Sequence, residues 1–440
     1  MSCKKSLLQI LALLGTFLIS GLAHAATYTV GCPGGTPAPY PSINSVLPLL
    51  VPGDVVFVSG TCTENVTFEQ MNNIALVGSP SANLAGSLNI FDSSVIYVVS
   101  LIVTSANGYG IAVESGRDIN FDACTSNGNA DAGMYVENTS DVYIFPSGSF
   151  DNNGNAGIYS DSNSFVALYA FGGSIDISNN VSAGIICFSC MIQNDGNVTI
   201  SGNKAVPGSL AVSGFGVDLR GAARAQFGAF YGPNVIQLNQ SGGISLQENS
   251  EISFFGGALI PGGQLNILQN NGPVGVVVSY GSQATFFESA RILNHSEVGV
   301  DVYGHSQAYF NGDNRIQLNA TGSAPSRAGL RVDGDSEALL RDGEISQNSG
   351  PGILALVNSS VDFADLVFGQ NEGGSVVCDS TSYMASDLSK SQQNPSHGII
   401  CQTPHNFGNH RNYKMAAPHV HDVTKLKAQH NYYQNLIAHH

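Results

Sequence analysis

Three acidic residues recur at one position of three successive repeats, each four residues after a glycine that starts an apolar strand. They are Glu114, Glu137 and Asp161. Carboxylates stacked on neighbouring strands lie about 4.8 Å apart, so they repel one another and favour protonation or a bound cation. Oxygen ligands of this kind suit Ca²⁺, and a carboxylate pair can also act as general acid and base. Solvated acids on an acidic protein are the simpler alternative.

Aromatic side chains accompany the second and third of these acids. Tyr135 and Tyr159 stand two residues before Glu137 and Asp161, on the same face of a strand whose side chains alternate. Flat aromatic faces suit packing against sugar rings. The sequence therefore predicts substrate contacts at both tyrosines.

A second group of reactive side chains occurs in two later repeats. Asp301, Tyr303 and His305 follow one strand glycine, and Arg331 and Asp333 follow the next. This group combines acid, base and cation, as a polysaccharide lyase or hydrolase requires, and Tyr303 would contact the substrate. An ordinary ion pair between Arg331 and either aspartate is the alternative.

Both groups belong to one internal repeat that must position them. A glycine, an aliphatic residue, any residue and usually a second apolar residue recur ten times at intervals of 23 to 32 residues. Because side chains alternate across a strand, the two apolar positions face inward and the other two face outward. The ten glycines are Gly110, Gly133, Gly157, Gly184, Gly216, Gly243, Gly275, Gly299, Gly329 and Gly352.

Two more short strands follow each glycine-initiated strand, and the last ends in asparagine. Three strands per turn of about 22–25 residues, separated by turn-tolerant Asn and Gly, predict an all-β fold, a right-handed parallel β-helix. A propeller needs a longer unit, and a leucine-rich repeat needs a missing Leu/Asn consensus. The segments Lys204–Phe215 and Ala320–Arg327 interrupt the spacing and are predicted to be loops. The asparagines are Asn127, Asn153, Asn180, Asn203, Asn239, Asn270, Asn294, Asn319, Asn348 and Asn371.

The N-terminus has the features of a secretory signal. Lys4 and Lys5 precede the apolar stretch Leu7–Ile19, and Ala23-His24-Ala25 supplies a cleavage pattern. That stretch is short for a membrane span. We therefore expect residues 1–25 to be a signal peptide and the mature protein to be secreted, extracellular or periplasmic.

The remaining chain divides by composition. We expect an N-terminal cap at 26–52 that contains a short helix over Ser42–Leu50, because such a helix protects exposed rung edges. The parallel β-helix is predicted over 53–380. We expect residues 381–440 to form a C-terminal cap and a His-rich tail.

The entry to the first strands resembles a known superfamily. The stretch Tyr40–Phe68, with its PGD-V-V and ENV-T patterns, and IALVG at Ile74–Gly78 are similar to the start of pectate-lyase-like β-helices. The resemblance covers Tyr28 to Ser380 and implies a substrate groove on the outward face of the glycine-initiated strands. The family's catalytic signatures are missing: no acid precedes the strand glycines, Gly304-His305-Ser306 lacks the second glycine of GHG, and there is neither Trp nor DPHD.

Cysteine usage fits an oxidising compartment, where disulfides are expected. Without the signal, seven cysteines remain, so at least one is a free thiol or pairs between chains. We expect Cys32–Cys62 and Cys378–Cys401 as end staples. The Cys187-x-x-Cys190 spacing is typical of redox or zinc sites, but a plain disulfide or buried thiols explain it more simply.

Charge separates the body from the tail. Residues 26–385 carry 9 basic and 30 acidic side chains, net −21, which repels nucleic acid and polyanionic glycans unless metal ions intervene. Neutral glycans are the expected partners. Beyond residue 380 lie eight of the eleven histidines and five Lys/Arg. His419, His421 and Asp422 could bind zinc or copper, and the tail either folds back onto the acidic body or stays mobile.

Two functions remain open. The first is a secreted β-helix protein that binds or processes an extracellular polysaccharide, with Ca²⁺ as the one candidate cofactor at the carboxylate column. The second is a non-catalytic adhesin or structural surface protein. The missing catalytic signature favours the second function, and the tyrosine–carboxylate column favours the first.

Overall fold

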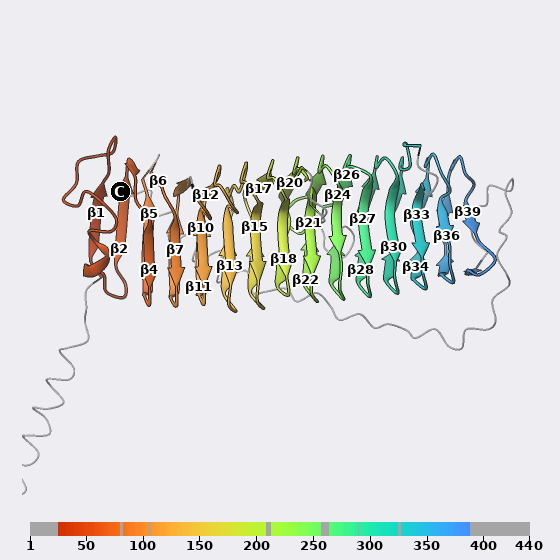
Figure 1. Cartoon of the computed structure of the whole chain (residues 1–440), viewed down its shortest axis with the longest axis horizontal. Helices are drawn as coiled ribbons and strands as arrows, with labels where there is room; N and C mark the ends of the chain where they lie inside the picture. Colours follow the sequence, from red (N-terminus) through yellow and green to blue (C-terminus); the bar gives the residue numbers. More distant parts are fainter. Residues whose placement is uncertain are drawn as a thin grey trace, which may run out of the picture.

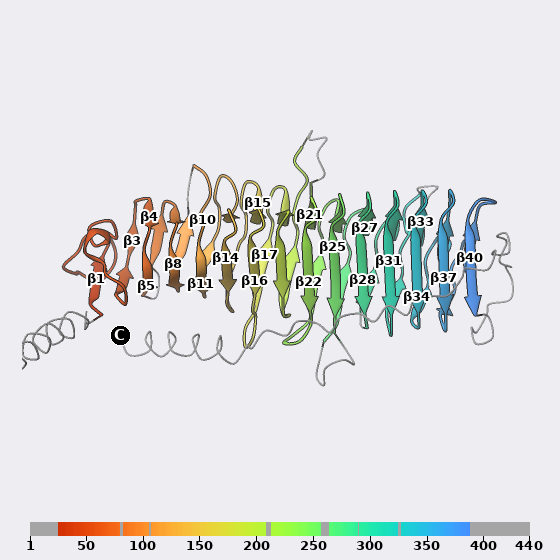
Figure 2. The same cartoon turned by 90° about the horizontal axis from the view of Figure 1, so that it is seen from below.

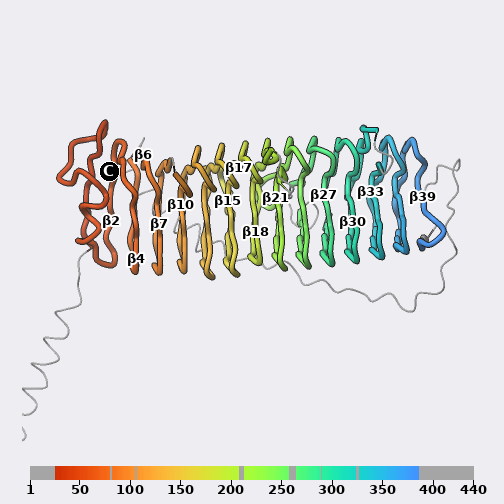
Figure 3. The backbone as a smooth tube through the Cα atoms, in the orientation of Figure 1, coloured from red at the N-terminus to blue at the C-terminus, as the bar shows by residue number. Residues whose placement is uncertain are grey.

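The computed structural model describes residues 25–79, 82–104, 107–207, 213–256, 264–288, 290–323 and 327–387. Nearly all of the predicted signal peptide and the His-rich tail lie outside these residues, as do Cys401, His419 and His421. Within them the chain is a parallel β-helix, which confirms the predicted fold class (Figure 1). Successive turns of the coil follow one another along the long axis, from the red N-terminal to the blue C-terminal end (Figure 3). No helix in the described part of the chain is long and apolar enough to cross a membrane.

One sheet contains the strands that the repeat glycines introduce, and we call it the Gly-initiated sheet. Every neighbouring pair in it is parallel, as in Ile111↔Met134 and Met134↔Ile158. Its thirteen strands are β4 (Val66–Glu69), β7 (Leu88–Phe91), β10 (Ile111–Glu114), β13 (Met134–Glu137), β15 (Ala156–Asp161), β18 (Ala183–Phe188), β21 (Phe215–Arg220), β24 (Gly242–Leu246), β27 (Val274–Ser279), β30 (Val298–Tyr303), β33 (Ala328–Asp333), β36 (Ile353–Ala355) and β39 (Val376–Cys378).

A fifteen-stranded sheet forms a second face (Figure 2). Its first strand belongs to the predicted N-terminal cap and its last lies beyond residue 380. The strands are β1 (Thr27–Gly31), β2 (Val55–Ser59), β5 (Asn72–Gly78), β8 (Ser94–Val99), β11 (Arg117–Asp122), β14 (Asp141–Ile144), β16 (Phe165–Leu168), β19 (Met191–Asn194), β22 (Arg224–Gly228), β25 (Glu251–Phe255), β28 (Gln283–Phe287), β31 (Gln307–Asn311), β34 (Glu337–Arg341), β37 (Ser360–Ala364) and β40 (Tyr383–Asp387).

Shorter strands complete each turn. They form one sheet of four and one of eight strands. The four are β3 (Thr61–Cys62), β6 (Asn83–Ala85), β9 (Ile102–Thr104) and β12 (Thr125–Ser126), and the eight are β17 (Ile175–Ser178), β20 (Val198–Ser201), β23 (Asn234–Gln237), β26 (Asn266–Gln269), β29 (Ala290–Leu293), β32 (Arg315–Gln317), β35 (Glu344–Ser346) and β38 (Val367–Phe368).

The first aliphatic residue after each repeat glycine is fully buried, as the alternation predicts. All ten, from Ile111 to Ile353, are 0% exposed and stack in the interior of the coil. On the fifteen-stranded sheet, four phenylalanines continue this stacking with ring centroids 4.6–5.6 Å apart. They are Phe227, Phe254, Phe286 and Phe310. Each turn therefore buries apolar area only against the turns above and below it.

Buried asparagines stack in a ladder beside the Gly-initiated sheet. In most turns the side-chain amide donates to the Oδ1 of the next asparagine, as from Asn153 to Asn180 at 3.0 Å and from Asn180 to Asn203 at 3.1 Å. The same oxygens also accept backbone N–H groups at the turn. Burying these amides is favourable because they are hydrogen-bonded. The ladder contains Asn129, Asn153, Asn180, Asn203, Asn239, Asn271, Asn319, Asn348 and Asn371.

The ladder explains why glycine begins each repeat strand. A Cβ at Gly184 would lie 2.6 Å from the Gly216 carbonyl oxygen and 3.0 Å from Asn203 Nδ2. The same two kinds of neighbour surround Gly157 and Gly216. Close approach of the backbone to the asparagine amides therefore leaves no room for a side chain.

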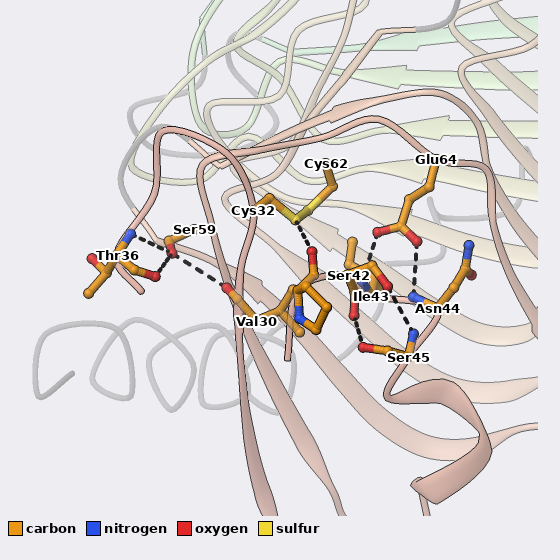
Figure 4. The surroundings of a disulfide bond; sticks show 11 residues. Val30, Cys32, Thr36, Ser42, Ile43, Asn44, Ser45, Ser59, Cys62 and Glu64 are labelled. Carbon is orange, nitrogen blue, oxygen red and sulfur yellow. Dashed lines mark hydrogen bonds between the residues drawn. A yellow bond between two sulfur atoms is a disulfide. The ribbon is translucent and has the colours of Figure 1, made fainter. Parts of the chain in front are cut away.

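The predicted capping helix is shorter than expected. Instead of a helix over Ser42–Leu50, the chain forms a three-residue 3-10 helix, Leu47–Leu49. Before it, the Glu64 carboxylate accepts the backbone N–H groups of Ile43 and Asn44 at 2.7 and 3.1 Å (Figure 4). These long-range bonds shape the segment as a turn that a local helical pattern could not reveal.

Two disulfides lie in the described chain. The Cys32–Cys62 disulfide confirms the predicted N-terminal staple (Figure 4). Cys187 and Cys190 also form a disulfide, which was the simpler of the two interpretations of their spacing. Cys378 is disulfide-bonded too. Cys124 is a buried free thiol, which accounts for the odd count, and burial raises its pKa to about 12.

We expect the Cys32→Ser/Cys62→Ser variant to lose about 2–4 kcal/mol of unfolding free energy, since that disulfide closes a loop between cysteines 30 residues apart. The Cys187→Ser/Cys190→Ser variant is the matched comparison and should lose less, because its cysteines are only three residues apart. Urea denaturation of both variants would measure this, and an equal or larger loss from the second pair would contradict it.

Candidate functional site

The predicted tyrosine–carboxylate column is assembled on the outward face of the Gly-initiated sheet. Register pairs Glu114 with Glu137 and Tyr135 with Tyr159, and all four side chains are partly exposed. Asp161 follows on the next strand, β15. We call Tyr109, Tyr135, Tyr159, Glu137 and Asp161 the tyrosine–carboxylate surface.

Tyr135 sits at the centre of this surface. Its hydroxyl lies 2.8 Å from Glu137 Oε2 and 3.2 Å from Asp161 Oδ2. The phenol has one proton, so it can donate to only one of these carboxylates at a time. Desolvation, the hydrogen bond to Glu137 and the charge of Asp161 raise the pKa of Tyr135 far above its usual value, which keeps the phenol protonated.

The structure adds Tyr109, which the sequence analysis missed. Its ring stacks on Tyr135 with centroids 4.5 Å apart and an interplanar angle of 8°, and Tyr135 lies 5.4 Å from Tyr159. Tyr109 immediately precedes the strand glycine Gly110, outside the strand positions that the repeat defines. Three successive turns therefore present a continuous row of aromatic rings.

The three predicted metal ligands do not converge. Glu114 accepts a hydrogen bond from Asn138 Nδ2 at 2.8 Å. Among the residues that the structure describes, the only three potential ligand atoms within 4.8 Å of one another belong to Cys32, Cys62 and Glu64. That group is no metal site, since its two sulfurs form a disulfide.

The neighbouring turns continue the surface with an ion pair. On β21, Arg220 forms a salt bridge with Asp218, which is 1% exposed and whose pKa is raised by burial. Phe188 on β18 pairs in register with Arg220 and is 46% exposed. Asp218 occupies the outward position that Tyr135 and Tyr159 occupy in their repeats, so the repeat spacing was the signal that could have identified it.

The second predicted group is only partly brought together. Arg331 binds Asp301 through two hydrogen bonds of 2.7 and 2.5 Å, and Asp301 is 4% exposed. This is the ordinary ion-pair alternative. Burial raises the pKa of Asp301 in spite of the arginine. Tyr303 pairs in register with Asp333 and packs edge-to-face on Tyr280 with centroids 5.9 Å apart.

His305 stands apart from that group. It is exposed in the turn after β30, with φ at 63°, and its backbone N–H donates to the Gly334 carbonyl. Over the described ranges, its imidazole has neither a hydrogen bond nor an ion pair. The structure therefore does not place His305 in contact with Asp301 or Arg331.

The two predicted loops adjoin the same sheet. Residues 204–207 and 213–214 precede β21, and 320–323 precede β33. Both lie at the edge where the Gly-initiated strands begin. The coloured ends of the loop before β21 rise beside the label of that strand in Figure 2.

Comparison with known proteins gives no family. No family model and no curated protein matches the chain. Among solved structures, the Azotobacter vinelandii mannuronan C-5 epimerase AlgE4 A-module is 14% identical, covering 75% of this chain and 91% of that chain with a TM-score of 0.39. Pectate lyase Pel9A is 11% identical (84% and 79% covered, TM-score 0.36). The Agl-KA catalytic domain is 12% identical (83% and 68% covered, TM-score 0.33).

Proposed function

We propose that this protein is secreted and binds an extracellular glycan on the outward face of the Gly-initiated sheet. The observation that carries this proposal is the row of Tyr109, Tyr135 and Tyr159 beside two carboxylates. Aromatic faces offer a rigid apolar platform, and carboxylates accept hydrogen bonds from hydroxyl groups. Both features suit a polyhydroxylated ring.

An unfilled acceptor in this surface supports the proposal. Asp161 Oδ1 is buried and has no hydrogen-bond partner. A buried acceptor without a donor costs about 1–3 kcal/mol, and a ligand hydroxyl would recover this cost once the carboxylate turns to expose that oxygen. The ligand that carries this donor should not be anionic, since the surface is already anionic and the body carries −21. A neutral glycan therefore fits better than a polyanionic one.

Binding without turnover is the form of this function that the geometry favours. Arg331 holds both oxygens of Asp301, and the exposed His305 does not contact them, so the predicted acid–base group lacks a free base beside a free acid. We propose Asp301, Tyr303, Arg331 and Asp333 as a second contact region of the same face. The two disulfides support secretion, because they form in oxidising compartments.

The test is a glycan array with the mature chain and a Tyr135→Ala/Tyr159→Ala variant. We expect wild type to bind a neutral glycan and the variant to bind it at least about tenfold more weakly, equivalent to about 1.4 kcal/mol. A Phe287→Ala variant is the matched control, since it removes an aromatic ring from the outward side of the fifteen-stranded sheet. It should bind as wild type does.

A reducing-sugar assay on the bound glycan separates binding from catalysis. We expect no turnover. Wild type that binds no neutral glycan, or a double variant with unchanged affinity, would overturn the proposed surface. Turnover that the Asp301→Asn variant abolishes would replace simple binding with a catalytic function.

A further inference from the structure

One buried carboxylate near the N-terminal end of the coil has backbone partners but no cationic side chain. Asp54 is 0% exposed, and no ion pair among the described residues includes it. Its Oδ2 accepts the backbone N–H of Val51 at 2.8 Å, and its Oδ1 accepts the backbone N–H of Ala26 at 2.6 Å. Hydrogen bonds stabilise a buried carboxylate, and a cation in the same site stabilises it further.

Two backbone contacts hold the Ala26 nitrogen at this carboxylate. The Ala26 carbonyl accepts the Val55 N–H at 3.0 Å, and β1 continues from there in parallel register with β2. On the other side, Gly53 has φ at 102°, a conformation that favours glycine, and its N–H donates to the Asn73 carbonyl oxygen at 2.6 Å. The turn before β2 is therefore fixed next to the start of β1.

Ala26 is also the residue that the predicted cleavage would expose. Ala23-His24-Ala25 places the scissile bond between Ala25 and Ala26. Water adds across this peptide bond, which leaves a carboxylate on Ala25 and an α-ammonium on Ala26. The nitrogen that lies 2.6 Å from Asp54 Oδ1 is then a cation, and short distances are typical of hydrogen bonds between an ammonium and a carboxylate.

We propose that signal-peptide cleavage creates an ion pair between the Ala26 α-ammonium and the buried Asp54, and that this pair anchors the first strand of the coil. The inference uses the secretion proposed above and is independent of glycan binding. Ala25 is exposed and lies beside Gly53, whereas Ala26 is partly buried. Removal of Ala25 therefore leaves the other ammonium protons on the side that faces water, where they need no protein acceptor.

The uncleaved chain holds a weaker version of the same contact. Its Ala26 N–H belongs to a neutral amide, which donates to Asp54 without balancing its charge. Cleavage adds the attraction between two opposite charges, and this attraction is stronger at a buried carboxylate than in bulk water. The strand β1 should therefore pair more tightly with β2 in the mature chain than in its precursor.

Hydrogen exchange at the Val55 amide tests the ion pair, because this N–H donates to the Ala26 carbonyl. The comparison uses two full mature chains, one starting at Ala26 and one at Ala25. The extra residue turns the Ala26 nitrogen into a neutral amide and moves the ammonium about 3.8 Å along the chain. Asp54→Asn should speed exchange at least about tenfold more in the chain that starts at Ala26. Any effect of the substitution on the intrinsic exchange rate is the same in both chains and cancels.

Asp92→Asn is the matched control, because Asp92 is an exposed acid in a turn near the same end of the coil. It should leave the exchange rate of the Val55 amide unchanged in both chains. Cyanate labelling of the α-amine gives a second readout, since an ammonium held by a carboxylate supplies less of the reactive neutral amine. We expect the Ala26 amine to react at least about threefold more slowly than the Ala25 amine. Asp54→Asn should remove this difference.

Mass spectrometry of the N-terminal peptide of the exported protein locates the cleavage, and we expect the chain to start at Ala26. A different start, an equal effect of Asp54→Asn in the two chains, or equal cyanate reactivity of the two amines would overturn the ion pair. Each of these results leaves glycan binding on the Gly-initiated sheet untouched. A chain retained in the cell with residues 1–25 attached would overturn both the ion pair and the proposed secretion.

Discussion

Replacing Asn180 with alanine is expected to lower the free energy of unfolding by more than about 4 kcal/mol. Asn180 Oδ1 accepts both the backbone N–H and the side-chain amide of Asn153, each at 3.0 Å. Its own amide donates to the Phe150 carbonyl and to Asn203. Alanine would leave several fully buried polar groups without partners, and each such group costs about 1–3 kcal/mol.

Urea denaturation followed by circular dichroism would measure the loss. The matched control is Asn179→Gly, because Asn179 is the exposed neighbour with φ at 58°, a conformation that glycine adopts freely. The control should stay within about 0.5 kcal/mol of wild type. A similar small change in the Asn180→Ala variant would show that the ladder is not a main source of stability.

His295 is expected to make the fold acid-sensitive, and a His295→Asn variant should remove that sensitivity. His295 takes the ladder position between Asn271 and Asn319 and is 0% exposed. Its Nε2 lies 3.2 Å from the Leu268 carbonyl oxygen, whereas its Nδ1 has no partner. Desolvation lowers the pKa of His295 to about 4 from 6.5, because burial disfavours the imidazolium.

The direction of the pH effect follows from this lowered pKa. The unfolded chain takes up a proton below about pH 6.5, and the folded chain resists it until about pH 4. Stability from the neutral imidazole is therefore complete above pH 6.5 and is lost as pH falls, by about 3 kcal/mol in total. Between pH 7 and pH 4, wild type should therefore lose about 3 kcal/mol of unfolding free energy relative to the His295→Asn variant.

Urea midpoints of both proteins at pH 7, 5.5 and 4 would test this. His305→Asn is the control, since it makes the same histidine-to-asparagine change at an exposed turn position. A constant difference between the His295→Asn variant and wild type across this range would rule out His295 as the sensor. Completing the ladder with asparagine should also make the variant at least as stable as wild type at pH 7.

The sequence did not show which asparagines form the buried ladder and which lie in turns. Asn153, Asn180 and Asn203 were predicted strand ends and are ladder members, but Asn270 and Asn294 are turn residues with φ at 51° and 60°. In those two turns the ladder position is the next residue, Asn271 or His295. Asparagine tolerates the left-handed conformation and also forms buried ladders, so its type alone does not distinguish the two roles.

In the candidate site, too, the sequence predicted some features and the tertiary structure decided others. The alternation placed Tyr135, Tyr159, Glu137 and Asp161 on one face, since the strand period of two fixes direction. The alternation could not show that Glu114 accepts a hydrogen bond from the Asn138 side chain. These outcomes depend on rotamers and on contacts between residues about 24 positions apart.

The sequence by itself determined the coil, its parallel register and its outward faces, because ten repeats with one inward pattern can bury their apolar residues in only one way. Tertiary structure alone decided which outward charges pair, as Arg331 does with Asp301, and which outward surfaces are shielded. Pairing and shielding depend on neighbours brought together by stacking. Local sequence carries no record of those distances.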